Sequence, residues 1–490
     1  MTRLLVLAAA LVAAGPARAF EAAPTHAAMT EAAAWPSKLV DALRRWGRAR
    51  GPYEPLALRL EAEAGARQDR VAVARLRRRL EQLDPGAGYA PAGERATLAA
   101  IGWLVAGAVL EEIPSSRGRH HFLDPVDGRG LDDARPGASL LMNVLGAVDV
   151  GGTFAGLFTG GNFDLTGMPA DRWIVSPENE QSYEVFLAEL RRSAVAGTPE
   201  ARDDALARGL LALGGVLHVL QDMASPSHAR NDFRVAHLAS AGWPSASALD
   251  RGPAFERWVA LAYGPTAPEV GGGELSRVRL RDFFRAQDGK GLADFTARNF
   301  FSPGTLPRAA ALRAGLSPPE IVARLDAQLA RPEPRIAALS RGAKAAYARG
   351  IVPHLARHRV DASGRLAWSL DAECHADYAR VLVREAVRAS RDLIAFALRG
   401  RLDVRAEGGG LRIANAGVAL AHGRLSILAE SADGRRVPLG DVVPRLPAPR
   451  AAELALAAPA VPDGTRRLVV VFDGEDGWGE PLVIIETLGL

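Results

Sequence analysis

The chain is poor in cysteine and in lysine. Among its 490 residues there is a single cysteine, Cys374, and one thiol cannot close an intrachain disulfide bond. The 60 basic residues include only three lysines, so arginines spread along the chain carry the positive charge, with no block of basic residues. These absences exclude a disulfide scaffold and give little support to nucleic-acid binding through a basic patch.

Long apolar runs are also scarce. The one of note covers residues 4–15; it follows Arg3 and precedes an A-x-A sequence at residues 17–19, the pattern of a secretory signal. No later run approaches the roughly 20 apolar residues of a membrane span. We therefore expect residues 1–19 to be a signal peptide and the mature chain to begin at Phe20. Such a chain would have no transmembrane segment and would be secreted or periplasmic.

The chain does have the composition of a globular protein, 48% hydrophobic and 24% charged, with a net charge of +4. Residues 20–400 show the periodicity of helices. One helix face is predicted by four leucines at steps of four, three and four: Leu206, Leu210, Leu213 and Leu217. A second helix is predicted from Asp371, a plausible N-cap, to Arg399, with Gly400 as its stop. We expect residues 20–400 to form an all-α domain.

After residue 400 the pattern changes to short β-rich runs. The runs cover residues 425–428, 468–472 and 482–485, and Asp-Gly turn signals occur at 433–434, 463–464 and 473–474. We expect residues 401–490 to form a small all-β, sandwich-like domain.

The clearest chemical motif lies inside the leucine-rich helix. His218 and Asp222 are four residues apart, which stacks their side chains on one helix face as two ligands of one cation require. Pro226 is expected to end or kink the helix, so that His228 is presented from the turn that follows. Gly214 and Gly215 precede the motif and would let another helix approach closely.

Two explanations of this motif remain open. A lone histidine or aspartate is more often a structural residue. Here an ionisable pair sits in an otherwise apolar helix, and an unpaired buried charge is destabilising. The pattern therefore favours metal binding or an ion pair.

A second set of polar residues lies upstream. Glu112 and His121 flank a short polar connection, and Asp124 with Pro125 starts a turn. The expected new N-terminus, Phe20, is followed closely by His26. Taken alone, these residues are also compatible with a solvated helix end and a frayed terminus.

Together, the H-x3-D-x5-H motif at His218, Asp222 and His228 and the H-F-x-D-P-x-x-G run at residues 121–128 resemble the superfamily of zinc-dependent phospholipases C and single-strand-specific zinc nucleases. The resemblance covers most of residues 20–399. It implies an all-helical domain that holds three zinc ions in a cleft. One zinc is bound in that family by the free amine and carbonyl of a processed N-terminal residue.

The resemblance implies specific ligands. Phe20 and His26 would bind one zinc, and Asp222 would bridge it to a second, which would also be held by Glu112, His121 and His218. Glu112 and Asp222 would be the catalytic residues, with Glu112 as general base or water orienter. The chain departs from the family where Phe20 replaces a tryptophan and Glu112 an aspartate.

A third zinc would be bound by His228 and Glu256. The family's remaining histidine is replaced by Gly252, so one ligand is missing. Asp232, His237 or His375 could supply it, and a two-metal site is the alternative. The resemblance therefore implies two or three zinc ions.

We expect an exported zinc-dependent phosphoric-diester hydrolase, most similar to a phospholipase C, that acts on a phospholipid or another phosphodiester, with peripheral membrane contact. One alternative is a single-strand-specific nuclease, for which nucleic acid would be the substrate. Another is a non-catalytic, zinc-stabilised surface or lipid-binding protein that docks through the β-domain.

Overall fold

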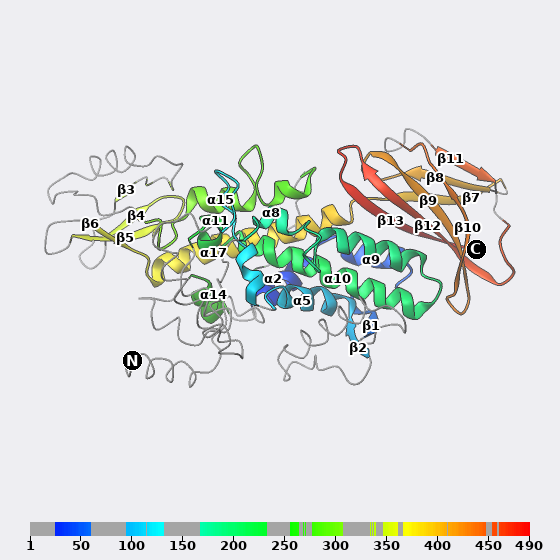
Figure 1. The fold of residues 1–490 in the computed structure, drawn as a ribbon, viewed down its shortest axis with the longest axis horizontal. Coiled ribbons are helices and arrows are strands. Elements are labelled where there is room, and N and C mark those ends of the chain that lie inside the picture. Colours follow the sequence, from blue (N-terminus) through cyan, green and yellow to red (C-terminus); the bar gives the residue numbers. More distant parts are fainter. Residues whose placement is uncertain are drawn as a thin grey trace, which may run out of the picture.

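The computed structural model describes residues 25–59, 95–113, 115–131, 167–232, 255–263, 268, 270, 277–306, 334, 336, 338–339, 346–360, 366–408, 410–446, 453–457 and 460–490. In these parts, a group of helices lies between two regions of sheet (Figure 1). The longer helices are α2 (Thr25–Ala34), α3 (Leu39–Arg45), α5 (Ala100–Leu110), α9 (Tyr183–Val195), α10 (Pro199–Asp222), α14 (Phe255–Tyr263), α15 (Leu292–Asn299) and α17 (Ala372–Ala397). Short helical turns are η1 (Gly51–Tyr53), η3 (Ser115–His120), α8 (Ala170–Trp173), α11 (Pro226–Ala229) and η4 (Leu280–Phe283).

Helix α10 is the centre of the helical group. The Thr198 hydroxyl accepts a hydrogen bond from the backbone N–H of Ala201, and Pro199 occupies the first turn, where no backbone donor is required. Helices α2, α5, α9 and α17 pack around it. The predicted leucine face is buried, but so is nearly every residue from Ala205 onward, because neighbours cover α10 on all sides.

Helix α17 confirms the second predicted helix. The Asp371 carboxylate caps its N-terminus by accepting a hydrogen bond from the backbone N–H of Cys374. The helix ends at Ala397, before Gly400. A Cβ on Gly400 would lie 2.4 Å from the Ile484 side chain, so this glycine makes room for strand β13 rather than ending the helix.

The prediction that residues 20–400 are all-α is wrong in one respect, because this region also contains strands. β1 (Pro55–Arg59) and β2 (Arg95–Ala99) form an antiparallel pair. A four-stranded antiparallel sheet contains β3 (Ala338–Leu339), β4 (Ala346–Arg349), β5 (Ala356–Val360) and β6 (Leu366–Ser369). These strands are short and rich in alanine and arginine, which have little intrinsic strand preference, so cross-strand pairing determines them.

The predicted β-sandwich is present. One sheet has the order β10 (Arg436–Val442), β9 (Leu420–Ser431), β12 (Thr465–Asp476), β13 (Pro481–Gly489), and the other β11 (Glu453–Ala457), β8 (Gly410–Asn415), β7 (Leu402–Glu407). Apolar side chains of both sheets form one core. The turn predicted at residues 473–474 is wrong: these residues continue β12, and the chain turns beyond Asp476, where Gly479 has φ 77°.

The sandwich (β7 to β13) shares a second core with the helical part that precedes it. Val469, Val471 and Ile485 belong to the same apolar cluster as the helices. Just after α17, the Arg399 guanidinium forms a buried ion pair of 2.9 Å with Asp476. These contacts fix the sandwich against the helical part. No helix in the described residues is long and apolar enough to span a membrane.

Candidate metal centre

The carboxylate of Asp222 lies among three buried histidines. Its Oδ2 is 2.8 Å from Nδ1 of His121 and 3.3 Å from Nε2 of His218, and its Oδ1 is 3.3 Å from Nε2 of His26. The three histidines have no exposed surface and Asp222 has 1%. The i,i+4 spacing on α10 places His218 beside Asp222, while α2 supplies His26 and the segment after η3 supplies His121.

Glu112 extends this cluster. Its Oε1 lies 3.9 Å from Nε2 of His218, and its side chain retains 21% exposure. Potential ligand atoms fall into two groups, each within 4.8 Å: His26, His218 and Asp222, and Glu112, His121 and His218. His218 is common to both groups. The structure therefore brings together all five of the described side chains that were predicted to bind the first two metals.

The histidine rings are oriented by a second set of hydrogen bonds. Nδ1 of His218 donates to the carbonyl oxygen of Ala108 at 2.6 Å, and Nδ1 of His26 donates to the side-chain oxygen of Gln221 at 2.7 Å. These bonds place the proton on Nδ1 of each ring and leave Nε2, which faces Asp222, as an electron-pair donor. Imidazole and carboxylate ligands arranged in this way fit a zinc ion.

Glycines allow the close approach of α5 and α10 at the cluster. A Cβ on Gly214 would lie 2.1 Å from the carbonyl oxygen of Leu104, and one on Gly107 would lie 2.1 Å from that of Leu211. A Cβ on Gly215 would meet Gln181 at 2.6 Å and Glu111 at 2.8 Å. The predicted approach of another helix is confirmed for Gly214, whereas Gly215 makes room for the side chains of Gln181 and Glu111.

Glu111 is a site residue that the sequence analysis missed. Its fully buried carboxylate accepts hydrogen bonds from the Arg117 guanidinium at 2.6 Å and the Trp173 indole at 2.9 Å, and lies 3.6 Å from Nε2 of His121. Arg117 also donates to Asn179. The signal was present in the adjacent pair at 111 and 112, but two neighbouring glutamates do not show which one faces the histidines.

The charges of Glu111 and His121 stabilise each other. Burial opposes ionisation of Glu111, but the nearby Arg117 and His121 outweigh it and lower its pKa to about 2. Burial likewise opposes protonation of His121, yet hydrogen bonds with Asp222 and Glu111 raise its pKa to about 9. The same balance of burial against Asp222 raises the pKa of His26. The carboxylates thus stabilise positive charge at the site.

For Glu112 and His218, the pKa shifts favour the uncharged form. Burial and the charge of Asp222 raise the pKa of Glu112 to about 8. Burial, together with the charge of His26, lowers the pKa of His218 to about 4. His218 is therefore neutral at pH 7, the form in which imidazole binds metals. A glutamic acid with a pKa near neutrality is suited to proton transfer.

His228 is presented differently from the prediction. Helix α10 ends at Asp222, and Pro226 begins the short helix α11 instead of ending the long one, because proline is well tolerated in a first helical turn. His228, on α11, is 8% exposed; its ring stacks on Phe122, and its Nδ1 donates to the His121 carbonyl oxygen at 2.8 Å.

The third metal site was predicted at His228 and Glu256. Neither residue belongs to the two ligand groups found among the described residues. Glu256, on α14, is buried and accepts a hydrogen bond from the Ser225 hydroxyl. His375, on α17, is also buried, and within the described residues neither of its ring nitrogens has a hydrogen-bond partner. Asp232 accepts a 2.6 Å hydrogen bond from the backbone N–H of Gly304, which gives it a structural role.

Two predicted ligands, Phe20 and His237, lie outside the described residues, as does Gly252. The roles assigned to them stay predictions.

Comparisons with known proteins add little to this geometry. No protein-family profile matches the chain. No curated protein matches it. Among solved structures, the alpha toxin from Clostridium absonum is similar over 96% of this chain and 96% of its own, with 10% identity and a TM-score of 0.25. A TM-score this low does not establish a common fold, so an assignment of function depends on the residues of the site.

Proposed function

We propose that this protein is a zinc-dependent phosphodiesterase that hydrolyses phospholipids in the manner of a phospholipase C. The observation that carries the proposal is the position of Asp222 among His26, His121 and His218, with Glu112 at the more exposed side. Five convergent imidazole and carboxylate groups are more than a single structural ion pair requires.

Each residue has a proposed role. His26 and Asp222, with the backbone of Phe20, would hold one zinc ion, and Glu112, His121 and His218 would hold a second that shares Asp222. Bound zinc ions supply an activated water and neutralise charge on phosphoryl oxygens. Glu112 would accept or orient a proton of the attacking water, since it is the most exposed carboxylate of the cluster.

Further groups would support this centre. Glu111 and Gln221 would hold the rings of His121 and His26 in their ligating orientations. His228 and Glu256 are proposed for a third zinc ion, and His375 could complete that site because its buried ring nitrogens have no hydrogen-bond partner within the described residues.

A phospholipid is proposed as the substrate because the chain has no block of basic residues to follow a nucleic-acid backbone. Export as a secreted or periplasmic protein is proposed because residues 1–19 have the pattern of a signal peptide. Cleavage after residue 19 would also expose the amine of Phe20.

The test compares two substrates on the same zinc-loaded protein, prepared with Phe20 as its first residue. Release of phosphocholine from phosphatidylcholine vesicles is measured beside hydrolysis of single-stranded DNA, with and without a chelator. We expect chelator-sensitive phosphocholine release that is lost in Asp222→Asn. Hydrolysis of DNA alone would identify nucleic acid, and not phospholipid, as the substrate. If the zinc-loaded protein hydrolyses neither substrate, the result would favour the non-catalytic alternative.

A further inference from the structure

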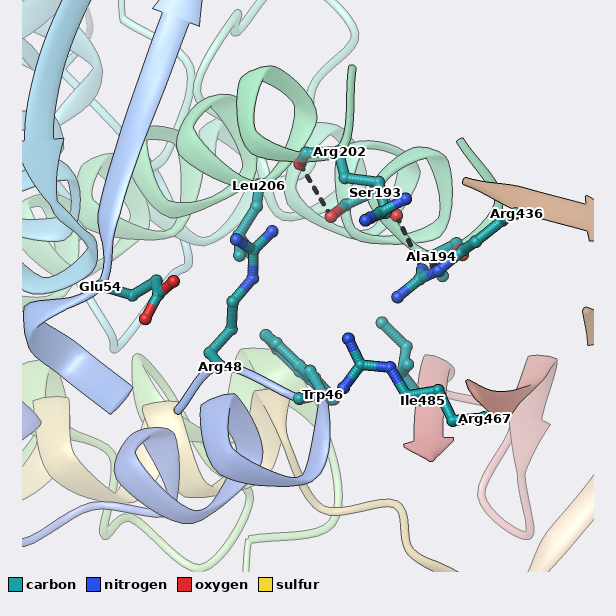
Figure 2. A pocket seen from close by; sticks show the side chains of 11 residues that line it. Trp46, Arg48, Glu54, Ser193, Ala194, Arg202, Leu206, Arg436, Arg467 and Ile485 are labelled. Carbon is teal, nitrogen blue, oxygen red and sulfur yellow. Dashed lines mark hydrogen bonds between the residues drawn. The ribbon is translucent and has the colours of Figure 1, made fainter. Parts of the chain in front are cut away.

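Four arginines surround a cavity at the junction between the helical part and the sandwich. The cavity has a volume of about 190 Å³. Arg48 and Arg202 reach it from the helical part, and Arg436 and Arg467 from strands β10 and β12. Figure 2 shows Arg48, Arg436 and Arg467 directed toward the same space, with Trp46 beside them. We call this space the junction cavity.

The carboxylates near the junction cavity balance these charges incompletely. Glu430 accepts hydrogen bonds from both Arg436 and Arg467, so one carboxylate serves two guanidinium groups. Asp203 pairs with Arg48 at 2.6 Å. Arg202 donates to a neutral acceptor, the carbonyl oxygen of Gly434, at 2.5 Å.

Glu54 is the acidic residue that lines the junction cavity, and its carboxylate accepts a hydrogen bond from the backbone N–H of Arg50. Among the described residues, Glu54, Glu430 and Asp203 thus provide three carboxylates beside four guanidinium groups.

An excess of positive charge in a partly buried place is unfavourable unless an anion compensates it. Burial lowers the pKa of Arg202, and burial together with the charge of Arg202 lowers that of Arg436 to about 10. Both arginines remain charged at neutral pH. Planar guanidinium groups bind phosphate oxygens through paired hydrogen bonds, which a chloride ion cannot match.

We propose that the junction cavity is a binding site for a phosphate group, either free phosphate or a phosphomonoester. The volume suits a small anion, since pockets for drug-sized ligands measure about 300–1,000 Å³. The site is separate from the candidate metal centre: Arg202 and Asp222 lie 20 positions apart on α10, which spans about 30 Å of helix.

Binding at this place would strengthen the junction. The lining includes the end of α9, the start of α10 and strands β10, β12 and β13, so the complete site exists only when the sandwich is seated on the helical part. A ligand that binds only the assembled state stabilises it by mass action.

The proposal is tested by isothermal titration of the full chain with inorganic phosphate and, separately, with phosphocholine, and by thermal unfolding at constant ionic strength. We expect saturable phosphate binding and a rise in Tm beyond that given by sodium chloride. Binding of phosphate alone would assign the site to the free ion, and binding of both would assign it to phosphomonoesters as well. Binding of neither would overturn the proposal.

Two substitutions of opposite sign make the test specific. Arg48→Gln should weaken phosphate binding by about 10- to 100-fold, the range for loss of a charged hydrogen-bond partner. Glu54→Gln should strengthen it, because a negative charge leaves the lining. Arg208→Gln is the matched control, since Arg208, like Arg48, pairs with an aspartate, Asp204, but does not line the junction cavity. Equal affinities in Arg48→Gln, Glu54→Gln and the unaltered protein would contradict the proposed site.

Discussion

Oδ2 of Asp222 lies 2.8 Å from Nδ1 of His121, and both residues are buried. This contact joins the end of the central helix α10 to the segment after η3, which are far apart in the sequence. The other side of the His121 ring faces Glu111 at 3.6 Å. An imidazole held between two carboxylates is either an ion pair or a metal ligand with its orienting group, and the following experiments separate the two.

Replacement of Asp222 should remove zinc binding. Asp222→Asn keeps the shape of the side chain but loses the negative charge and one acceptor oxygen. We expect zinc affinity, measured by competition with a chromophoric chelator, to fall by at least about 100-fold, since even outer-shell changes are worth 10- to 100-fold. Asp294→Asn is the matched control: Asp294 is also buried but caps α15 through Gly291. Equal zinc affinity in the two variants would mean that the cluster is an ion-pair network and not a metal site.

Replacement of Glu111 should weaken metal binding without abolishing it. Glu111→Gln removes the charge that faces His121 and leaves Arg117 without its anionic partner. The expected loss in zinc affinity is about 10- to 100-fold, with the same number of ions bound at saturation. Glu189→Gln, a change in another glutamate that pairs with an arginine, should leave zinc affinity unchanged. A loss of stoichiometry in Glu111→Gln would mean that Glu111 is itself a ligand.

Zinc affinity should rise with pH. The pKa of His121 is raised to about 9 and that of Glu112 to about 8, so both residues hold protons at pH 7 that a metal ion must displace. Calorimetric titration in two buffers of different ionisation enthalpy should show proton release on binding, with affinity increasing from pH 6 to pH 9. A pH-independent affinity would remove these two residues from the ligand set.

The stability of the metal-free protein should change in the opposite direction. For both His121 and Glu112 the folded-state pKa exceeds the unfolded value, so the folded state binds more protons and loses stability as pH rises. The contribution of His121 is complete below about pH 6.5 and is lost as pH rises through about 9. We expect Tm in the presence of a chelator to fall between pH 6 and pH 9, and zinc to reduce that fall. A Tm that rises over this range with chelator present would contradict the assigned charges.

The crossing of α5 and α10 should tolerate no side chain at Gly214. In Gly214→Ala the new Cβ would lie 2.1 Å from the Leu104 carbonyl oxygen, so the helices must separate, at a cost of about 1–3 kcal/mol or more. Gly209→Ala on the same helix is the control, because its nearest neighbour would be at an ordinary 3.4 Å and alanine favours helix by about 1 kcal/mol. Chemical denaturation measures both. Equal stability of the two variants would mean that the helices do not pack so closely.

The parts of the fold that depend on local sequence could be predicted. The leucine spacing of α10 and the Asp371 cap of α17 are local signals, so the two long helices are evident from the sequence. The sheet β3 to β6 could not be predicted, because its short strands are stabilised by their pairing. The end of α17 near Gly400 could be predicted, but the role of this glycine could not, since Ile484 packs on it from a distant strand.

The same distinction applies to the candidate metal centre. His218 and Asp222 could be paired from their spacing alone, because one helix turn fixes the direction of both side chains. His26 and His121 required the family resemblance, since no local rule joins them to α10. Glu111 remained hidden because its direction depends on Arg117 and Trp173, which reach it through tertiary contacts.

The number of zinc ions per chain is the quantity to measure first. Protein processed to begin at Phe20 would be supplied with zinc, freed of unbound metal and analysed by plasma mass spectrometry, beside Asp222→Asn and His218→Ala. We expect at least two zinc ions per chain in the unaltered protein and a loss of bound zinc in both variants. Folded protein that retains no zinc, or equal zinc content in all three, would contradict a metal centre built around Asp222.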